Sequence, residues 1–236
     1  MTELLYLKDS YLQDFEATVT KVEGKMVVLD KTAFYPQGGG VPDDRGKLIN
    51  IANSKTYNVQ MVKKMGTDVM HEVDEVGLKM GDKVHGWLDW PRRYKLMRAH
   101  TAAHILSAVV NRETGALITG NQIDLDKARI DFDLETFDRE KIAEYCAKAN
   151  QEIAKNQPIT VEFLPREEAL KIPAVIKLAG ALPPAVKELR ILRIGDVDVQ
   201  ADGGPHVANT KEVGTVEIVS TENKGKNNRR VYFTLR

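Results

Sequence analysis

The spacing of apolar side chains changes near residue 89, and this change divides the chain into two parts of different architecture. Before it, apolar and polar residues alternate over short stretches, as around Phe15, Ala17 and Val19, which is the period-two pattern of a half-buried strand. After it come long segments that no helix breaker interrupts. Because 42% of the 236 residues are apolar and 29% are charged, the chain can form one large or two small folded domains.

The first part, residues 1–88, is predicted to be a domain of short strands. Residues 15–29 have the pattern of a hairpin whose turn contains Gly24. Further strands are expected at residues 46–51, 56–63 and 69–73, separated by polar and glycine-containing turns. These elements predict a small β-barrel or a β-sandwich.

The second part, residues 89–236, is predicted to begin with a long helix. Asp89 is a suitable N-cap, Pro91 is tolerated in a first helical turn, and the segment continues to about residue 113 before Gly115 interrupts it. A second helix is expected at residues 136–156, because acidic residues stand near its start and its apolar residues share one face.

Strands are expected around these two helices. Residues 128–134 and 161–164 have strand patterns, and residues 213–220 and 230–235 suggest a closing hairpin. The fold class is therefore predicted to be α+β, with a β-barrel-like N-terminal domain at 1–88 and an α+β domain with an antiparallel sheet at 89–236.

Two histidines mark the first helix as a candidate metal site. His100 and His104 are four residues apart, so both imidazoles project from one face and can reach the same ion. Alone the pattern is weak, since a helix also carries histidines for packing. No glutamate follows His100, so the helix lacks the general base of the metalloprotease motif.

A second pair could complete this site. Asp202 and His206 are also four residues apart, around the glycines of the segment ADGGPHV, whose turn can bring both side chains towards one point. Three imidazoles and one carboxylate are an acceptable set of zinc ligands. The alternative is that this segment is only a polar turn.

Five segments occur in an order that is informative as a whole: FYPQGGGVPDDRG at 34–46, WLDWPRRYKLMRAHTAAHIL at 87–106, GNQIDLDKARIDFD at 120–133, ADGGPHVANTKEVG at 201–214 and ENKGKNNRRVYF at 222–233. Together they resemble the editing domain of alanyl-tRNA synthetases and the free-standing alanyl-tRNA editing proteins of the AlaX family. The glycine-rich first segment resembles the longer AlaX form, in which a barrel-like domain precedes the editing domain. No adenylation domain is present, so the resemblance implies an editor that acts in trans.

The resemblance also implies a reaction and a cofactor. The reaction is hydrolysis of the ester that joins a wrong amino acid, chiefly serine and with glycine left open, to tRNA(Ala). The implied Zn²⁺ ligands are His100, His104 and His206. Asp202 stands where the synthetase and many relatives have cysteine, and either it binds zinc or water takes that position.

An editing pocket must recognise the serine hydroxyl, because a synthetic site shaped around alanine cannot reject one extra hydroxyl strongly. Thr119 and Gln122, expected on the turn that follows the histidine-bearing helix, correspond to the family's polar pocket residues. Ordinary loop polarity is the alternative for both.

Any binding of tRNA must use local patches, because 34 basic and 34 acidic residues give zero net charge. The first domain and its glycine-rich segment are expected to serve tRNA recognition. No Walker motif is present, so no nucleotide is expected. The candidate RNA-binding residues are Gln37, Gly38, Gly39, Gly40, Arg92, Arg93, Lys224, Lys226, Arg229 and Arg230.

Composition excludes other classes of protein. The single Cys146 excludes a disulfide framework. The sequence contains no apolar run of about 18 residues, so no membrane-spanning helix is expected. The N-terminus lacks a signal-peptide layout, so a cytoplasmic location is expected. The main alternative function is a tRNA-binding module in which zinc is structural and hydrolysis has been lost.

Overall fold

The computed structural model describes residues 1–136, 138–173, 175 and 187–236. The chain divides into two compact units, Met1–Leu96 and Met97–Arg236. The division lies inside helix α1 (Trp90–Thr114), shortly after the change of pattern at residue 89. The α+β class is confirmed. Among the helices that the structure describes, none is long and apolar enough to cross a membrane.

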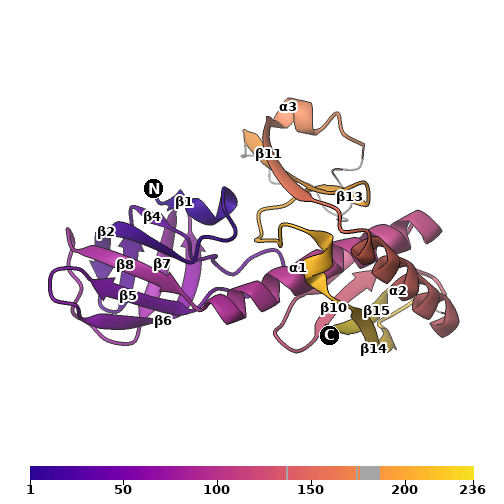
Figure 1. Cartoon of the computed structure of the whole chain (residues 1–236), viewed down its shortest axis with the longest axis horizontal. Coiled ribbons are helices and arrows are strands. Elements are labelled where there is room, and N and C mark those ends of the chain that lie inside the picture. Colours follow the sequence, from indigo (N-terminus) through magenta and orange to yellow (C-terminus); the bar gives the residue numbers. More distant parts are fainter. Residues whose placement is uncertain (137, 174, 176–186) are drawn as a thin grey trace. The chain divides into compact units, whose positions relative to one another are not determined.

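The first unit contains a closed antiparallel barrel of six strands, so the barrel, not the sandwich, is the correct alternative (Figure 1). Its strands follow one another around the barrel in the order β2-β3-β7-β6-β5-β8, and β1 pairs in parallel with β4 outside it. The elements are β1 (Glu3–Leu4), the 3₁₀ helix η1 (Leu5–Leu7), β2 (Asp14–Glu23), β3 (Met26–Leu29), β4 (Lys31–Thr32), β5 (Gly46–Asn50), β6 (Thr56–Met65), β7 (Asp68–Val73) and β8 (Lys83–Leu88).

Strand β8 was not expected from the sequence. Its inward positions are Val84, Gly86 and Leu88, and the glycine weakens the apolar alternation. Gly86 lies opposite Phe15 of β2, and a β-carbon on it would lie 2.6 Å from the Phe15 ring. The aromatic ring therefore fills the space that a side chain at residue 86 would otherwise occupy.

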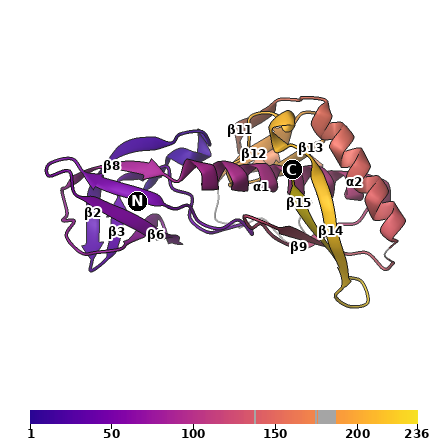
Figure 2. The same ribbon diagram turned by 60° about the horizontal axis from the view of Figure 1, so that its bottom comes forward.

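The second unit contains two antiparallel sheets. One has the strand order β14-β15-β10-β9 and the other β11-β12-β13. Helix α2 contacts β14 (Figure 2). The elements after α1 are β9 (Ile118–Gln122), β10 (Ala128–Phe132), α2 (Arg139–Ala154), β11 (Ile159–Pro165), α3 (Arg166–Ala169), β12 (Glu188–Ile194), β13 (Asp198–Ala201), the 3₁₀ helix η2 (Thr210–Val213), β14 (Val216–Asn223) and β15 (Arg229–Leu235).

Helix α1 begins and ends as its sequence suggests. The Asp89 carboxylate accepts the backbone N–H of Arg92 at 3.2 Å, which is an N-cap bond. At the other end Gly115 has a φ of 75° and donates its N–H to the Asn111 carbonyl, as a helix-terminating glycine does. Ile105, within α1, is completely buried.

Helix α2 is shorter at both ends than expected. Asp138 is its N-cap, not part of its first turn, and accepts the N–H of Glu140 at 2.9 Å. Cys146 lies on the buried face, where its thiol donates to the Val216 carbonyl, and burial raises its pKa. This thiol is therefore a core residue.

Candidate metal centre

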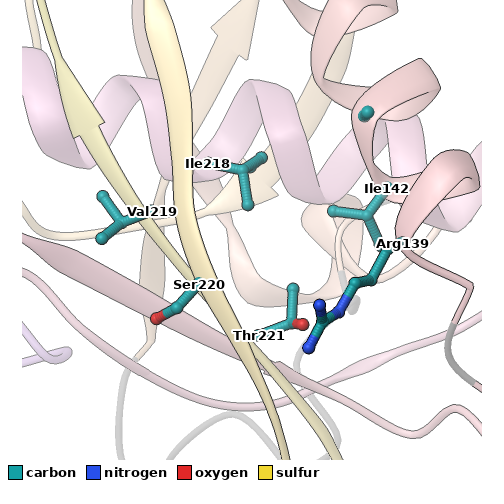
Figure 3. A pocket seen from close by; sticks show the side chains of 7 residues that line it. Arg139, Ile142, Ile218, Val219, Ser220 and Thr221 are labelled. Carbon is teal, nitrogen blue, oxygen red and sulfur yellow. The ribbon is translucent and has the colours of Figure 1, made fainter.

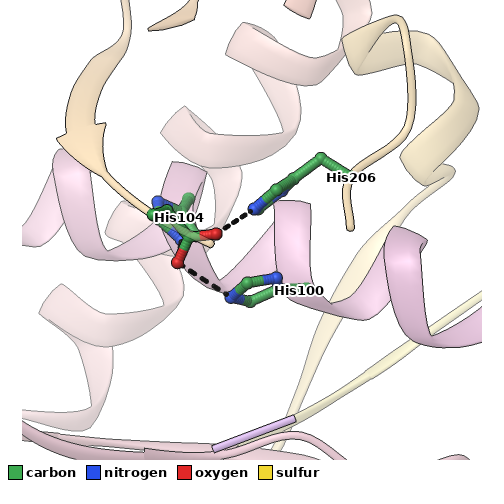
Figure 4. Close-up of side chains that lie close together, drawn as sticks. His100, His104 and His206 are labelled. Carbon is green, nitrogen blue, oxygen red and sulfur yellow. Dashed lines mark hydrogen bonds and ion pairs between the residues drawn. The ribbon is translucent and has the colours of Figure 1, made fainter. Parts of the chain in front are cut away.

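The four predicted metal-binding side chains lie together in the second unit (Figure 4). His100 and His104 occupy successive turns of α1, with ring centroids 5.0 Å apart. Asp202 and His206 come from the loop after β13, and the His206 ring stacks on that of His100 at 4.2 Å. All three imidazoles are buried.

The loop is held in a tight turn beside α1. The Asp202 carboxylate accepts the N–H of Gly204 at 2.7 Å, which is the Asx-turn bond. The buried Arg190 guanidinium donates to the backbone carbonyls of both residues, at 2.8 and 3.0 Å. The polar turn considered as an alternative is thus present, and it also places Asp202 and His206 in the cluster.

The Nε2 atoms of the three histidines all face the Asp202 carboxylate. His206 Nε2 lies 3.1 Å from Oδ1, and the Nε2 atoms of His100 and His104 lie 3.7 and 3.8 Å from Oδ2. One donor atom from each of the four residues lies within 4.8 Å of the others. Tetrahedral zinc needs ligand atoms roughly 3.4 Å apart, so a small contraction around an ion would meet that requirement.

The outward-facing Nδ1 atoms also have polar neighbours. His104 Nδ1 lies 3.0 Å from Asp198 Oδ2, His206 Nδ1 lies 3.0 Å from Thr101 Oγ1, and His100 Nδ1 lies 3.5 Å from the Pro205 carbonyl. An acceptor at Nδ1 favours the tautomer that keeps the lone pair on Nε2. All three rings are therefore oriented as metal ligands usually are.

The charges of the site favour a bound cation. Burial lowers the pKa of His100 to about 4, and burial and the neighbouring His100 hold the pKa of His206 well below its usual range. Burial alone would raise the pKa of Asp202, but the surrounding histidines hold it well below its usual value. Burial would also lower the pKa of His104, yet hydrogen bonds to Asp198 and Asp202 raise it to about 9. The ionised Asp202 carboxylate beside the two neutral imidazoles of His100 and His206 suits a divalent metal ion, and His104 would release its extra proton when it binds the ion.

The structure does not bring Thr119 and Gln122 together. Both lie on strand β9, not on a turn, so that expectation is corrected. The pairing of β9 with β10 is irregular between them, because Gly120 pairs with Asp131 and Ile118 with Phe132, which leaves Thr119 in a bulge. The Thr119 hydroxyl donates to Asn228 Oδ1 at 3.4 Å, whereas Gln122 lines a pocket that contains none of the four cluster residues.

That pocket has a volume of about 290 Å³ and lies on the sheet that contains β9, β10 and β15. It combines cations with one aromatic ring. Lys127 Nζ lies 4.5 Å from the centroid of the Tyr232 ring, and Asp131 accepts from the side chains of both Arg129 and Arg230. Its lining residues are Gln122, Asp124, Lys127, Arg129, Arg230 and Tyr232.

Two of the predicted RNA-binding arginines are structural, and their assignments are corrected. Arg93 is completely buried in the first unit, where its Nε lies 3.0 Å from both carboxylate oxygens of Asp44. Arg229 is buried where β15 begins, directly after the turn of the β14–β15 hairpin, and donates to Asn223 Oδ1 and to the carbonyls of Gly225 and Glu135. Arg93 has no exposed surface and Arg229 is 7% exposed, so both side chains serve mainly to hold the protein together in this structure.

The other predicted RNA-binding residues are more accessible. Lys224 and Lys226 are exposed in the hairpin around the turn that Arg229 holds, and Arg92 is half-buried with its guanidinium donating to the Asp43 carbonyl. In the glycine-rich segment, Gly39 and Gly40 have φ values of 58° and 83°. Between paired Gly38 and Val41 these values form a tight hairpin turn that needs glycine.

Another pocket lies between α2 and β14 and has a volume of about 290 Å³ (Figure 3). It is lined by Ile142, Ile218 and Val219 beside small polar residues, and Arg139 is the one charged side chain in its described lining. This lining contains no acid, base or nucleophile that is arranged for hydrolysis. The histidine cluster therefore remains the candidate reactive site.

Asp198, Gln200 and Thr101, which surround the histidines, were not expected from the sequence. Asp198 and Gln200 are two residues apart on β13, just before Asp202, so they share one buried face of the strand. Two polar residues at alternate positions beside a predicted metal ligand were the only sequence feature that pointed to them. Thr101 stands directly after His100, but a single hydroxyl in a helix carries no specific pattern.

Comparisons with known proteins agree with this geometry. Residues 4–92 match the family of class II (A) tRNA synthetases, and residues 189–232 match the threonyl and alanyl tRNA synthetase second additional domain. The alanyl-tRNA editing protein AlaX-M of Methanosarcina barkeri is 49% identical over 100% of this chain and 99% of its own. AlaX-M of Saccharolobus solfataricus is 47% identical over 100% of both chains.

A longer class of relative also matches. The alanine–tRNA ligase of Thermococcus kodakarensis is 39% identical over 98% of this chain, which corresponds to 25% of the ligase. The chain thus matches one part of the ligase but the whole length of the free-standing proteins. From the full-length identity, this chain belongs to the AlaX family of alanyl-tRNA editing proteins.

Proposed function

We propose that this protein removes serine from mischarged tRNA(Ala) by hydrolysing the aminoacyl ester, and that Zn²⁺ is its cofactor. The proposal rests on the convergence of three histidine Nε2 atoms on the Asp202 carboxylate. It is supported by full-length identity to proteins named for alanyl-tRNA editing. The chain's match to a quarter of an alanine–tRNA ligase is consistent with action in trans.

The donor set fits zinc better than a hard cation such as Mg²⁺. Three imidazole nitrogens and one carboxylate oxygen are typical of zinc, whereas Mg²⁺ prefers oxygen ligands and retained waters. His100, His104 and His206 would hold the ion, with Asp202 as the fourth ligand. Bound zinc would supply a Lewis acid, and with four protein ligands it would contact a substrate group only by taking a fifth ligand or by losing Asp202.

The residues of this chain would orient the substrate. A hydrogen-bond partner for the serine hydroxyl would be left unpaired with alanine, and an unpaired buried polar group weakens binding. Thr119 and Gln122 are the proposed partners.

The proposed tRNA contacts fall into three groups of residues. The first is the turn Gln37–Gly40 with Arg92, the second is the pair of lysines Lys224 and Lys226, and the third is the Tyr232 pocket with Arg230. Exposed lysines attract phosphates, and an aromatic ring beside cations can stack with an unpaired base.

The test is release of the amino acid from tRNA(Ala) charged with serine, alanine or glycine. We expect serine to be released and alanine to be retained. Release of glycine would show that glycine-charged tRNA(Ala) is also a substrate. His104→Ala should abolish release. His85→Ala is the matched control, because His85 pairs with Asp14 on the barrel and is no part of the cluster.

Binding of charged tRNA without release of any amino acid would contradict the proposal. That result would favour the alternative of a tRNA-binding module with a structural zinc. Release of serine and alanine at equal rates would contradict the proposed selectivity, although hydrolysis itself would stand.

A further inference from the structure

The cluster has a second carboxylate behind one of its histidines. Asp198 on β13 is buried, and its Oδ2 lies 3.0 Å from His104 Nδ1. His100 and His206 have a backbone carbonyl and a hydroxyl near the corresponding nitrogen. His104 therefore has an ionisable acceptor behind it, which polarises an imidazole more than a neutral acceptor does.

Asp198 is itself held in place by a side chain of the same strand. Gln200 Nε2 donates to Oδ2 of Asp198 at 2.9 Å, so the Gln200 amide and the His104 ring converge on one oxygen atom. Both residues are buried, and β13 is fixed by antiparallel pairing of Asp198 with Ile194 and of Gln200 with Leu192 on β12. The backbone that carries this carboxylate is thus fixed by the sheet, and Gln200 of the same strand contacts the carboxylate as well.

We infer that Asp198 is a positioning residue for the metal centre and that Gln200 keeps it in position. In the zinc-bound protein Asp198 would hold the proton of His104 on Nδ1, so that Nε2, on the side of Asp202, would bind the ion. It also makes His104 a stronger electron donor to a metal ion. The inference rests on the proposed zinc site, and outer partners of this kind commonly change metal affinity 10- to 100-fold.

A purely structural role for Asp198 predicts a different result. If the carboxylate only neutralises a buried imidazole, its loss would weaken the fold of the zinc-free protein, whereas the folded fraction would bind zinc normally. Zinc affinity must therefore be measured on protein shown to be folded, for example by circular dichroism.

The experiment is competition for zinc with a chromogenic chelator at one fixed pH. We expect Asp198→Ala to weaken zinc binding 10- to 100-fold. Asp198→Asn keeps an acceptor oxygen but removes the charge, so it should fall between Asp198→Ala and the unaltered protein. Gln200→Leu should weaken binding less than Asp198→Ala. The matched control is Asp196→Asn, which changes an exposed carboxylate two residues earlier.

The tautomer of His104 provides a second readout. In nitrogen-15 NMR spectra of the zinc-bound protein, we expect His104 to carry its proton on Nδ1 and to bind the metal through Nε2. Unchanged zinc affinity in Asp198→Ala, or coordination through Nδ1, would overturn the inference. If Asp198→Ala does not fold, Asp198→Asn and Gln200→Leu test the inference instead. Zinc affinity equal to that of the Asp196→Asn control in both variants would overturn the inference.

Failure of the proposed function gives a separate result. No zinc binding by the unaltered protein would overturn the metal centre and this inference together. Zinc affinity that falls most in Asp198→Ala and less in Asp198→Asn and Gln200→Leu would support the inference. If the unaltered protein then released no serine from tRNA(Ala), the proposed hydrolase function would be contradicted while the inference would stand.

Discussion

Gly204 lies so close to His100 that a β-carbon on it would be 2.6 Å from Cε1 and 2.9 Å from Nδ1 of the imidazole. The ring belongs to α1 and the glycine to the loop that supplies Asp202 and His206. Absence of a side chain therefore allows the two halves of the candidate metal site to meet.

Gly204→Ala is accordingly expected to reduce zinc content. The added methyl group must displace the His100 ring or move the loop, and either shift separates the ligands. Zinc per chain would be measured by elemental analysis of the purified protein. Gly120→Ala is the control, because its β-carbon would meet the nearest atom, Asp131 Oδ2, at an ordinary 3.4 Å. Full zinc content in Gly204→Ala would show that the close approach is unimportant for the site.

Substitutions of Asp202 test whether its carboxylate binds zinc directly or only lies beside the ion. The carboxylate faces all three Nε2 atoms, so we expect Asp202→Ala to lose most of its zinc. Asp202→Cys should retain the metal, since thiolate is a good zinc ligand. If water occupies the fourth position instead, Asp202→Ala would keep its zinc and only the rate of serine release would change.

His71 should make the stability of the barrel sensitive to acid. Its ring is completely buried between Thr32 Oγ1 and the Val27 carbonyl, and burial lowers its pKa from 6.5 to about 4. Between those pH values the unfolded chain binds more protons than the folded one. The free energy of unfolding therefore decreases as pH falls from 6.5 towards 4, by about 3 kcal/mol from this group.

The check is urea denaturation of the zinc-free protein at several pH values, for the unaltered chain and for His71→Gln. The variant should be less stable at pH 7 but should lose less of its stability on acidification. An identical pH dependence in both proteins would rule out His71 as the source.

Arg93 should matter for folding and not for direct contact with RNA. Besides Asp44, its guanidinium donates to the carbonyls of Ser10 and Ala33. Arg93→Met would leave the Asp44 carboxylate buried without its partner, so we expect a loss of about 3–5 kcal/mol in the free energy of unfolding. Arg92→Met is the control and should cost far less, because Arg92 is only half-buried. Comparable losses in both variants would contradict this interpretation.

Lys224 and Lys226 should contribute to tRNA affinity through charge alone. Replacing both with alanine should weaken binding and lower the slope of log K against log salt by roughly 0.7–0.9 for each phosphate that a lysine no longer neutralises. Filter binding across a salt series would measure this. Lys171→Ala, at another exposed lysine, should leave the slope unchanged. An unchanged slope in the double variant would remove these residues from the tRNA surface.

Local patterns in the sequence were sufficient for several elements of the fold. The β2–β3 hairpin, the extent of α1 and the buried face of α2 depend on alternation, capping and helical period within a few residues. The pairing of His100 with His104 is equally local, because one helical turn brings them together. The resemblance of five ordered segments to the AlaX family is likewise a property of the sequence alone.

Features that depend on distant residues were decided only by the tertiary structure. Whether Arg93 faces solvent depends on Asp44 in another segment, and the role of Gly86 depends on Phe15 across the barrel. The place of Asp198 behind His104 arises because β13 packs beside α1, although the two residues are far apart in sequence. Periodicity reports which face of an element is apolar, but it does not identify the partner that covers it. Burial, ion pairing and the orientation of the metal-facing nitrogens are properties of those partners, and so they depended on the folded chain.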